Sequence, residues 1–357
     1  MSFFMLKKRN CRCGSCGSFE TQKRGSQRGK KRYFCTKCKK SFSVDHTKKD
    51  KVFWIPHIDG IPFRKLADEY SMSHAQMYER VKQEMNNLPD NNWITLKYCN
   101  RFSGILVVDG KYVKVKGYTK KIPFIYGIDY LTHDMVVCLL APSENEEAFL
   151  KMFRILKTFS YSLQVVVCDD RSSLYPALKY HYPKAKVQLC QNHYVENIRT
   201  LLHIRTDTTH QHFFNSLSKH IFENYSDEEH LKDALQYVFQ KHAQQSIVRR
   251  NILEDIYKRR VQLFQYKTIS HCPKDTNLIE LFNSHINSRI KSTKGFQSFE
   301  SAYCWLNAYA LRRRTLKFTD CEKPFKHLNG KISVQMTLKK QTDLSVILSN
   351  SALKTER

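Results

Sequence analysis

The sequence predicts an α/β core that is interrupted by a helical segment and preceded by a cysteine-rich module and a short helical unit. Two Cys-x-x-Cys pairs occur near the start of the chain. Residues 104–189 alternate short apolar runs with amphipathic helical stretches, whereas residues 198–268 show no strand pattern. We therefore divide the chain into segments 1–51, 52–92, 93–197, 198–268, 269–331 and a tail over 332–357.

Composition narrows the class of protein. The 357 residues carry a formal net charge of +27, and 41% of them are hydrophobic, which excludes a disordered chain. No apolar run approaches the roughly 20 residues of a membrane span, and we expect neither a membrane association nor a signal peptide. The charge indicates a polyanionic partner such as a nucleic acid; the alternative is a soluble basic protein without one.

The spacing of the cysteines indicates a metal site. Cys13-Gly-Ser-Cys16 and Cys35-Thr-Lys-Cys38 form two knuckles, whose four thiolates can complete a tetrahedron around Zn²⁺. Cys11 is either a replacement for Cys13 or a spare thiol. The other cysteines are scattered among apolar neighbours, as expected in a reducing compartment.

A basic, hairpin-like stretch joins the two knuckles. The zinc could simply fold this module, but its basic residues favour a ribbon that also contacts DNA. The candidate DNA-binding residues here are Arg24, Arg28, Lys30, Lys31 and Arg32.

Residues 52–90 predict a small helical unit. One helix begins near Pro62, Ser73 is the expected N-cap of a second helix over 74–85, and a tight turn separates them. This arrangement is typical of a helix-turn-helix, although any helical hairpin can resemble one. We expect Ala75, Tyr78, Val81 and Met85 on the buried face, and His74, Gln76, Arg80 and Gln83 toward the DNA groove.

After a polar linker over 88–92, the pattern changes to strands. A first strand over 104–109 ends in Asp109, and a later strand over 163–168 ends in Asp169 and Asp170. Residues 112–116 alternate apolar and polar. The other strands are predicted at 123–130, 135–141 and 185–189, and the helices at 144–159, 172–181 and from about His193. We expect an antiparallel meander followed by crossover units that add parallel strands.

The helical segment and the last part of the core follow. Helices are expected over 210–222, 227–244 and 246–266, and a last helix from about Asp275 carries Glu280 in partly apolar surroundings. An acid at the end of an apolar strand is costly unless it binds something, commonly a metal. Asp109 and Asp169 can meet there if their strands are neighbours.

Longer motifs carry a specific resemblance. They are "LVVDGKYVKVKG", "VVVCDDRSSLYPAL", "YPKAKVQLCQNHYVENIR", "TNLIELFNSHINSRIKSTKGFQS" and "FKHLNGK". Together they resemble the landmarks of DDE transposases, most closely bacterial insertion-sequence enzymes of the Mutator-like superfamily, and the likeness extends to about residue 331. It implies a ribonuclease-H-like fold with an all-helical insertion before the final acidic helix.

The resemblance also implies roles for individual residues. Asp109, Asp169 and Glu280 match the three catalytic acids, which would hold two Mg²⁺ or Mn²⁺ ions. Family members usually place a small residue after the second acid, where this chain has Asp170, so Asp170 stays an alternative to Asp169.

Cys190 and His193 match the Cys-x-x-His of this superfamily, which favours a role in organising the active site. The alternatives are a zinc-ligand pair or a buried cysteine beside a capping histidine. The segment 198–268 lacks Trp, so Phe213, Tyr225 or Tyr237 would have to stack on a flipped base.

The expected function is transposition. The protein would bind terminal inverted repeats through residues 1–90, cleave DNA and join the 3′ ends to a target, as a dimer or higher oligomer. It would act in the cytoplasm at the nucleoid of a bacterium, or in a eukaryotic nucleus. Rivals are a DNA-binding regulator on a transposase scaffold and a nuclease without strand transfer. Lys111, Lys114 and Lys116 are further candidates for contacts with the DNA backbone.

Overall fold

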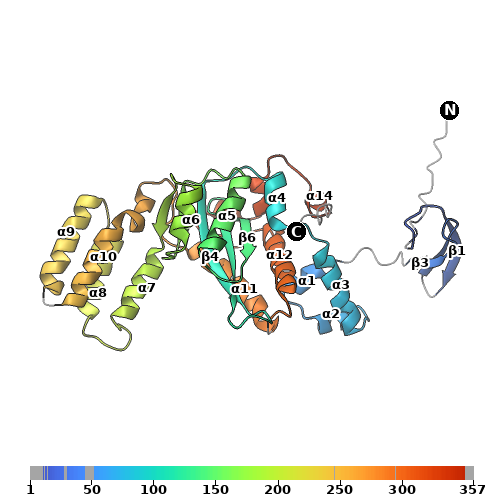
Figure 1. The fold of residues 1–357 in the computed structure, drawn as a ribbon, viewed down its shortest axis with the longest axis horizontal. Helices are drawn as coiled ribbons and strands as arrows, with labels where there is room; N and C mark the ends of the chain where they lie inside the picture. Colours follow the sequence, from blue (N-terminus) through green and yellow to red (C-terminus); the bar gives the residue numbers. More distant parts are fainter. Residues whose placement is uncertain are drawn as a thin grey trace. The chain divides into compact units, whose positions relative to one another are not determined.

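The computed structural model describes residues 11, 13, 15–27, 30–44, 52–244, 246–293 and 295–349, and the chain divides into two compact units, 1–53 and 54–357 (Figure 1). The first unit holds a three-stranded antiparallel sheet of β1 (Thr21–Gln27), β2 (Lys30–Cys35) and β3 (Ser41–Val44). The predicted pairing of the stretch between the knuckles is therefore confirmed. Tyr33 stacks on Phe42 with ring centroids 5.7 Å apart.

The second unit begins with three short helices, α1 (Trp54–Ile58), α2 (Phe63–Glu69) and α3 (His74–Asn86). Ser73 caps α3 as expected, and its hydroxyl accepts a hydrogen bond from the Gln76 backbone at 3.2 Å. The buried face of α3 consists of Met77, Val81 and Met85, which follow one i, i+4, i+8 row. The expectation that Ala75 and Tyr78 are buried is wrong, because the Tyr78 ring lies at the surface against the edge of Phe63.

A five-stranded mixed sheet forms the core, in the order β6-β5-β4-β7-β8. Its strands are β4 (Ile105–Val113), β5 (Ile122–Asp129), β6 (Asp134–Leu140), β7 (Val165–Cys168) and β8 (Lys186–Leu189). β4, β5 and β6 pair antiparallel, whereas β7 and β8 run parallel to β4. The predicted meander followed by parallel strands is confirmed.

The expectation that the first strand ends at Asp109 is wrong, because β4 runs unbroken through Asp109 to Val113. The long strand β5 pairs with it throughout, from Leu106 opposite Asp129 to Val113 opposite Ile122. The parallel partner β7 pairs only as far as Val107 opposite Val167. Asp109 therefore lies just past the point where one of its two neighbouring strands stops.

Helices cover the sheet and form the insertion (Figure 1). Around the sheet lie α5 (Glu146–Thr158), α6 (Leu174–His181), α11 (Asn277–Ile290) and α12 (Phe299–Thr315), whereas α7 (Gln191–Leu201) packs with the insertion. The insertion contains α8 (Gln211–Leu217), α9 (Glu228–Val238) and α10 (Ile247–Leu263), and π-helical turns over Ser218–Glu223 and Phe239–Ala243 extend the first two. The helical character predicted for 198–268 is confirmed. No helix in the described part of the chain is long and apolar enough to cross a membrane.

The residues expected to form a polar linker over 88–92 instead lead into α4 (Asn91–Tyr98). Asn91 is fully buried, and its side chain donates to the Met135 backbone carbonyl. Part of the expected tail is also buried, since α13 (Ser333–Thr337) packs on β6 and a further helix, α14, spans Leu344–Ser349. Asn91, Ser333 and Thr337 are polar because they take part in a buried hydrogen-bond network.

That network centres on Arg314. Its guanidinium forms a two-pronged ion pair with Asp134, with N–O distances of 2.7 and 2.8 Å. Thr337 donates to the same carboxylate at 2.6 Å, and Arg314 also donates to Thr95 and to Asn91. A buried charge is tolerated only when paired and hydrogen-bonded in this way. The contacts tie α4, β6, α12 and α13 together.

We predict that Arg314→Met lowers the free energy of unfolding by about 3–5 kcal/mol, because it leaves Asp134 buried without its partner. Arg312→Met on the same helix is the matched control. Arg312 pairs with Asp59 at 2.6 Å in a more exposed position, so its loss should cost only about 1 kcal/mol. Denaturant unfolding measures both, and equal losses would contradict the prediction.

Candidate active site and zinc-binding cysteines

The four cysteines of the two knuckles come together in the first unit. Their sulfur atoms all lie within 4.8 Å of one another, with Cys13–Cys38 at 3.7 Å and Cys16–Cys35 at 3.5 Å. Sulfurs bound to one tetrahedral zinc would be about 3.8 Å apart, so the arrangement fits this ion. Cys11 is not part of the group.

The pKa values of Cys13 and Cys16 shift in opposite directions. Burial raises the pKa of Cys13, but hydrogen bonds from the backbone of Cys16 and Ser15 and from neighbouring thiols outweigh it. The net effect lowers the pKa of Cys13 from 9.0 to about 6. Cys13 can therefore supply a thiolate, the form that binds zinc, near neutral pH. A hydrogen bond from the Ser18 backbone lowers the pKa of Cys16, but burial and the neighbouring thiols outweigh it and raise this pKa to about 12.

The basic residues of the ribbon face solvent. Arg24, Lys31 and Arg32 are exposed, and the Arg24 guanidinium lies 4.7 Å above the Phe34 ring. Lys30 begins β2, whereas Arg28 lies outside the described residues.

In the second unit, Asp109 of β4 and Asp169, the residue that follows β7, lie close together. The parallel register pairs Val107 with Val167, and continuing it by two residues brings Asp109 opposite Asp169. Burial raises the pKa of Asp109, and the nearby charge of Asp169 raises it further. Hydrogen bonds from the Gly110 backbone and from Asn283 act in the opposite direction.

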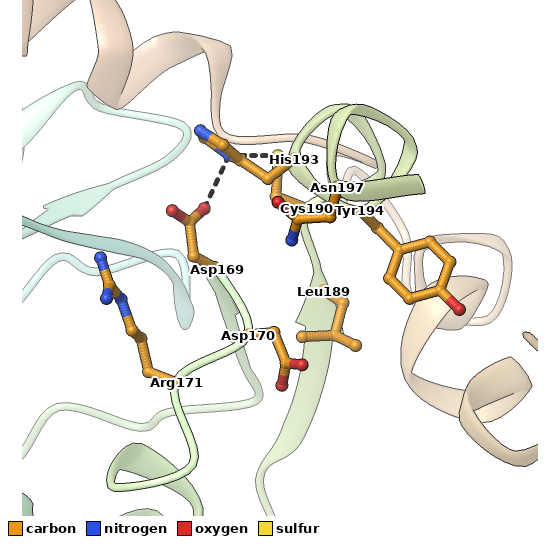
Figure 2. Close-up of a pocket in the computed structure, with 8 residues that line it drawn as sticks. All are labelled: Asp169, Asp170, Arg171, Leu189, Cys190, His193, Tyr194 and Asn197. Carbon is orange, nitrogen blue, oxygen red and sulfur yellow. Dashed lines mark hydrogen bonds and ion pairs between the residues drawn. The ribbon is translucent and has the colours of Figure 1, made fainter. Parts of the chain in front are cut away.

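Asp169 is joined to the start of α7. Its carboxylate accepts from His193 Nδ1 at 2.7 Å, and the same nitrogen lies 3.2 Å from Cys190 Sγ (Figure 2). The hydrogen bond to Asp169, followed by that to Cys190, raises the pKa of His193 from 6.5 to about 11 although burial lowers it. The buried Cys190 sulfur also accepts from the Thr276 hydroxyl at 3.1 Å. Asp169, Cys190 and His193 could together hold a metal ion.

Glu280 approaches this cluster from α11. Its Oε1 lies 3.8 Å from His193 Nε2, and the Thr276 hydroxyl donates to the same oxygen at 3.4 Å. The partly apolar surroundings expected of Glu280 do not bury it: Glu280 is exposed, and Leu281 beside it is 62% exposed. The reason is helical periodicity, since Ile279, Phe282 and Ile286 form the buried row.

Asp170 points away from Asp169 (Figure 2). It forms an ion pair with Arg259 of α10 at 2.5 Å, and the Tyr175 hydroxyl donates to it at 3.4 Å. The two adjacent acids therefore have different partners, one at the start of α7 and one in the insertion.

Sequence reasoning missed two polar residues here. Asn283, one turn after Glu280, donates to Asp109 at 2.5 Å and accepts from the Tyr126 hydroxyl at 2.8 Å. Glu144 accepts from the Tyr112 hydroxyl and lies 3.7 Å from Arg171. The i, i+3 spacing from Glu280 could have indicated Asn283, whereas Glu144 gave no signal beyond the start of a helix.

The remaining DNA-binding candidates are at the surface of the second unit. His74, Gln76 and Arg80 are exposed on α3, although Gln76 completes the capping box and Arg80 lies 3.6 Å from Glu84. Lys114 and Lys116 are exposed, and Lys111 is half-buried two residues after Asp109. Of the stacking candidates, Phe213 is buried, Tyr225 stacks on Phe264 and Tyr237 is 42% exposed.

We predict that the protein binds about one zinc ion per chain through the four cysteines. Cys35→Ala should abolish this binding and unfold residues 13–44, because the ion supplies most of the folding energy of such a module. The second unit has its own core and should keep its thermal transition. Metal analysis and calorimetry measure these effects.

Cys11→Ala is the matched control and should keep its zinc. Loss of zinc from Cys11→Ala, or its retention by Cys35→Ala, would contradict the assignment of ligands.

A comparison with known proteins identifies the family to which the chain belongs. The family model described as "Transposase, Mutator family" matches residues 70–313, which is more than half of the chain and includes Asp109, Asp169, His193 and Glu280. No curated protein matches the chain. The match to the family model shows that the chain belongs to the Mutator family of transposases.

Proposed function

We propose that this transposase has a ribonuclease-H-like core and cleaves and joins DNA with Asp109, Asp169 and Glu280. The family assignment already implies an enzyme that cleaves DNA. The observation that carries the finer proposal is the meeting of the three acids: Asp109 and Asp169 on neighbouring strands, and Glu280 joined to Asp169 through His193.

The sheet supports the proposed fold. A three-stranded meander extended by two parallel strands on the side of β4 is the arrangement expected of a ribonuclease-H-like core. The helical insertion lies between α7 and α11, hence before the helix that carries the third acid.

The acids fit divalent cations such as Mg²⁺ or Mn²⁺. Their carboxylates supply hard oxygen ligands, and Glu280 is exposed enough to move toward an ion. Such ions, when bound, would activate the attacking oxygen and stabilise the leaving one. Asn283 would orient Asp109, and His193 would orient Asp169 and keep it close to Glu280.

Asp169 is the better candidate for the second acid than Asp170. Both acids line the pocket drawn in Figure 2, but Asp169 also lines a small cavity with Asp109 and Glu144, and Asp170 does not. Asp170 is instead paired with Arg259. We therefore assign the metal to Asp169 and a supporting role to Asp170.

The DNA would be bound by the basic surfaces of both units. The zinc ribbon, with its exposed Arg24, Lys31 and Arg32, and the helix pair α2–α3 would read the terminal inverted repeats. Lys111, Lys114 and Lys116 would contact the phosphate backbone near Asp109. Because transposition holds two DNA ends together, we expect a dimer or higher oligomer.

The decisive experiment is strand transfer by purified protein with DNA that carries the element's own ends and Mg²⁺ or Mn²⁺. Asp109→Ala, Asp169→Ala and Glu280→Ala should each lose joined products by at least about 10³-fold while still binding DNA, because each removes a metal ligand. Asp170→Ala should still form joined products at saturating metal.

The outcomes separate the rival functions. Cleaved ends that never join a target would indicate a nuclease, and DNA binding without cleavage by the wild type would indicate a regulator. Activity in Asp169→Ala together with its loss in Asp170→Ala would reverse our assignment of the second acid.

A further inference from the structure

A direct ion pair connects the helical insertion to the loop that carries Asp169. Arg259 of α10 reaches Asp170 with an Nη1–Oδ2 distance of 2.5 Å. Asp170 directly follows Asp169, and the loop between β7 and α6 spans only residues 169–173. Any displacement of Asp170 therefore also displaces the residue to which we assign the second metal-binding carboxylate.

Arg259 is itself held in place from a second direction. Its Nε donates to Asp255 at 3.0 Å, one turn earlier on α10. Asp255 in turn accepts from the Tyr194 hydroxyl of α7 at 2.6 Å. The guanidinium thus lies between two carboxylates, and its orientation is fixed by α7 as well as by α10.

The ion pair between Arg259 and Asp170 also reduces the repulsion between Asp170 and Asp169. Two adjacent carboxylates repel each other, and a second free charge beside Asp169 would offer a competing ligand to a cation. Their side chains point in different directions (Figure 2), and the Arg259 charge offsets that of Asp170. Asp169 is left as the acid of this pair that contacts His193.

We propose that Arg259 is a positioning residue of the active site. It holds Asp170, and through Asp170 the loop, so that Asp169 is presented to the metal in one orientation. This inference rests on the proposed function. It assigns the insertion a structural part in metal binding, in addition to any contact that the insertion makes with DNA.

The experiment compares Arg259→Gln, Asp170→Asn, the double variant and Arg259→Lys in the full-length chain. DNA cleavage is measured against Mg²⁺ concentration, and Mn²⁺ binding without DNA is followed by electron paramagnetic resonance. Changing a residue that orients a metal ligand costs about 10- to 100-fold in affinity or activity. Arg259→Gln and Asp170→Asn should each raise the half-saturating metal concentration by about tenfold.

Two features distinguish positioning from a general loss of structure. The double variant should lose no more than either single variant, because both remove the same contact. Arg259→Lys should recover part of the loss, and the thermal transition should shift little, since a partly exposed pair contributes little to stability. Arg260→Gln is the matched control: Arg260 pairs with Glu228 within the insertion, at 3.0 Å, and its loss should leave metal dependence unchanged.

Other outcomes overturn the inference. Losses that multiply in the double variant would show that Arg259 and Asp170 act independently. Weaker DNA binding with unchanged metal dependence would make Arg259 a direct DNA contact. A lower half-saturating concentration in Arg259→Gln would make Asp170 a metal ligand. If the wild type binds Mn²⁺ but does not cleave DNA, and the variants bind Mn²⁺ more weakly as predicted, the proposed function is refuted and the positioning role stands.

Discussion

The parallel pairing of β4 with β7 is the constraint on which the candidate site depends. These strands are separated by two antiparallel strands and a helix in the sequence, yet their register brings Asp109 opposite Asp169. A shift of one residue would turn one of the two carboxylates to the other face of the sheet. Four residues of β7, all buried valine or cysteine, suffice to set this register because β8 pairs on their other side.

Glu280 is brought to the candidate site by a helix and not by a strand. Residues 277–290 are far from both strands in the sequence, and the helix they form is held against the sheet by its buried row and by Asn283. Tyr126 of β5 and Asp109 of β4 contact the two ends of one amide side chain. Asn283 therefore fixes the position of α11 on β4 and β5, and leaves Glu280 one turn away at the exposed edge.

Much of this arrangement could be predicted from the sequence, and the failures have physical causes. Strand and helix periodicity gave the order of the elements, and Cys-x-x-Cys spacing gave the cysteine group. The prediction of a linker at Asn91 was wrong because a polar residue that accepts a buried hydrogen bond from Arg314 looks like a surface residue in a sequence. The strand end predicted at Asp109 was wrong because β5 continues to pair with β4 beyond this acid, as far as Val113. Partners such as Asn283 and Arg259 depend on tertiary contacts that no local pattern records.

The net charge of the chain is positive, whereas the candidate site is rich in acidic side chains. The chain carries +27 overall, which attracts DNA over long distances. Asp109, Asp169 and Glu144 nevertheless line one small cavity, and Glu280 lies nearby. A phosphate would be repelled from these acids unless cations bound first, while burial already raises the pKa of Asp109 and so disfavours its charged form. Bound cations would stabilise the ionised form of the acids. They would also give the site a charge that attracts the DNA phosphates. The basic surface would then attract the DNA, and cations bound to the acids would allow a DNA phosphate to enter the candidate site.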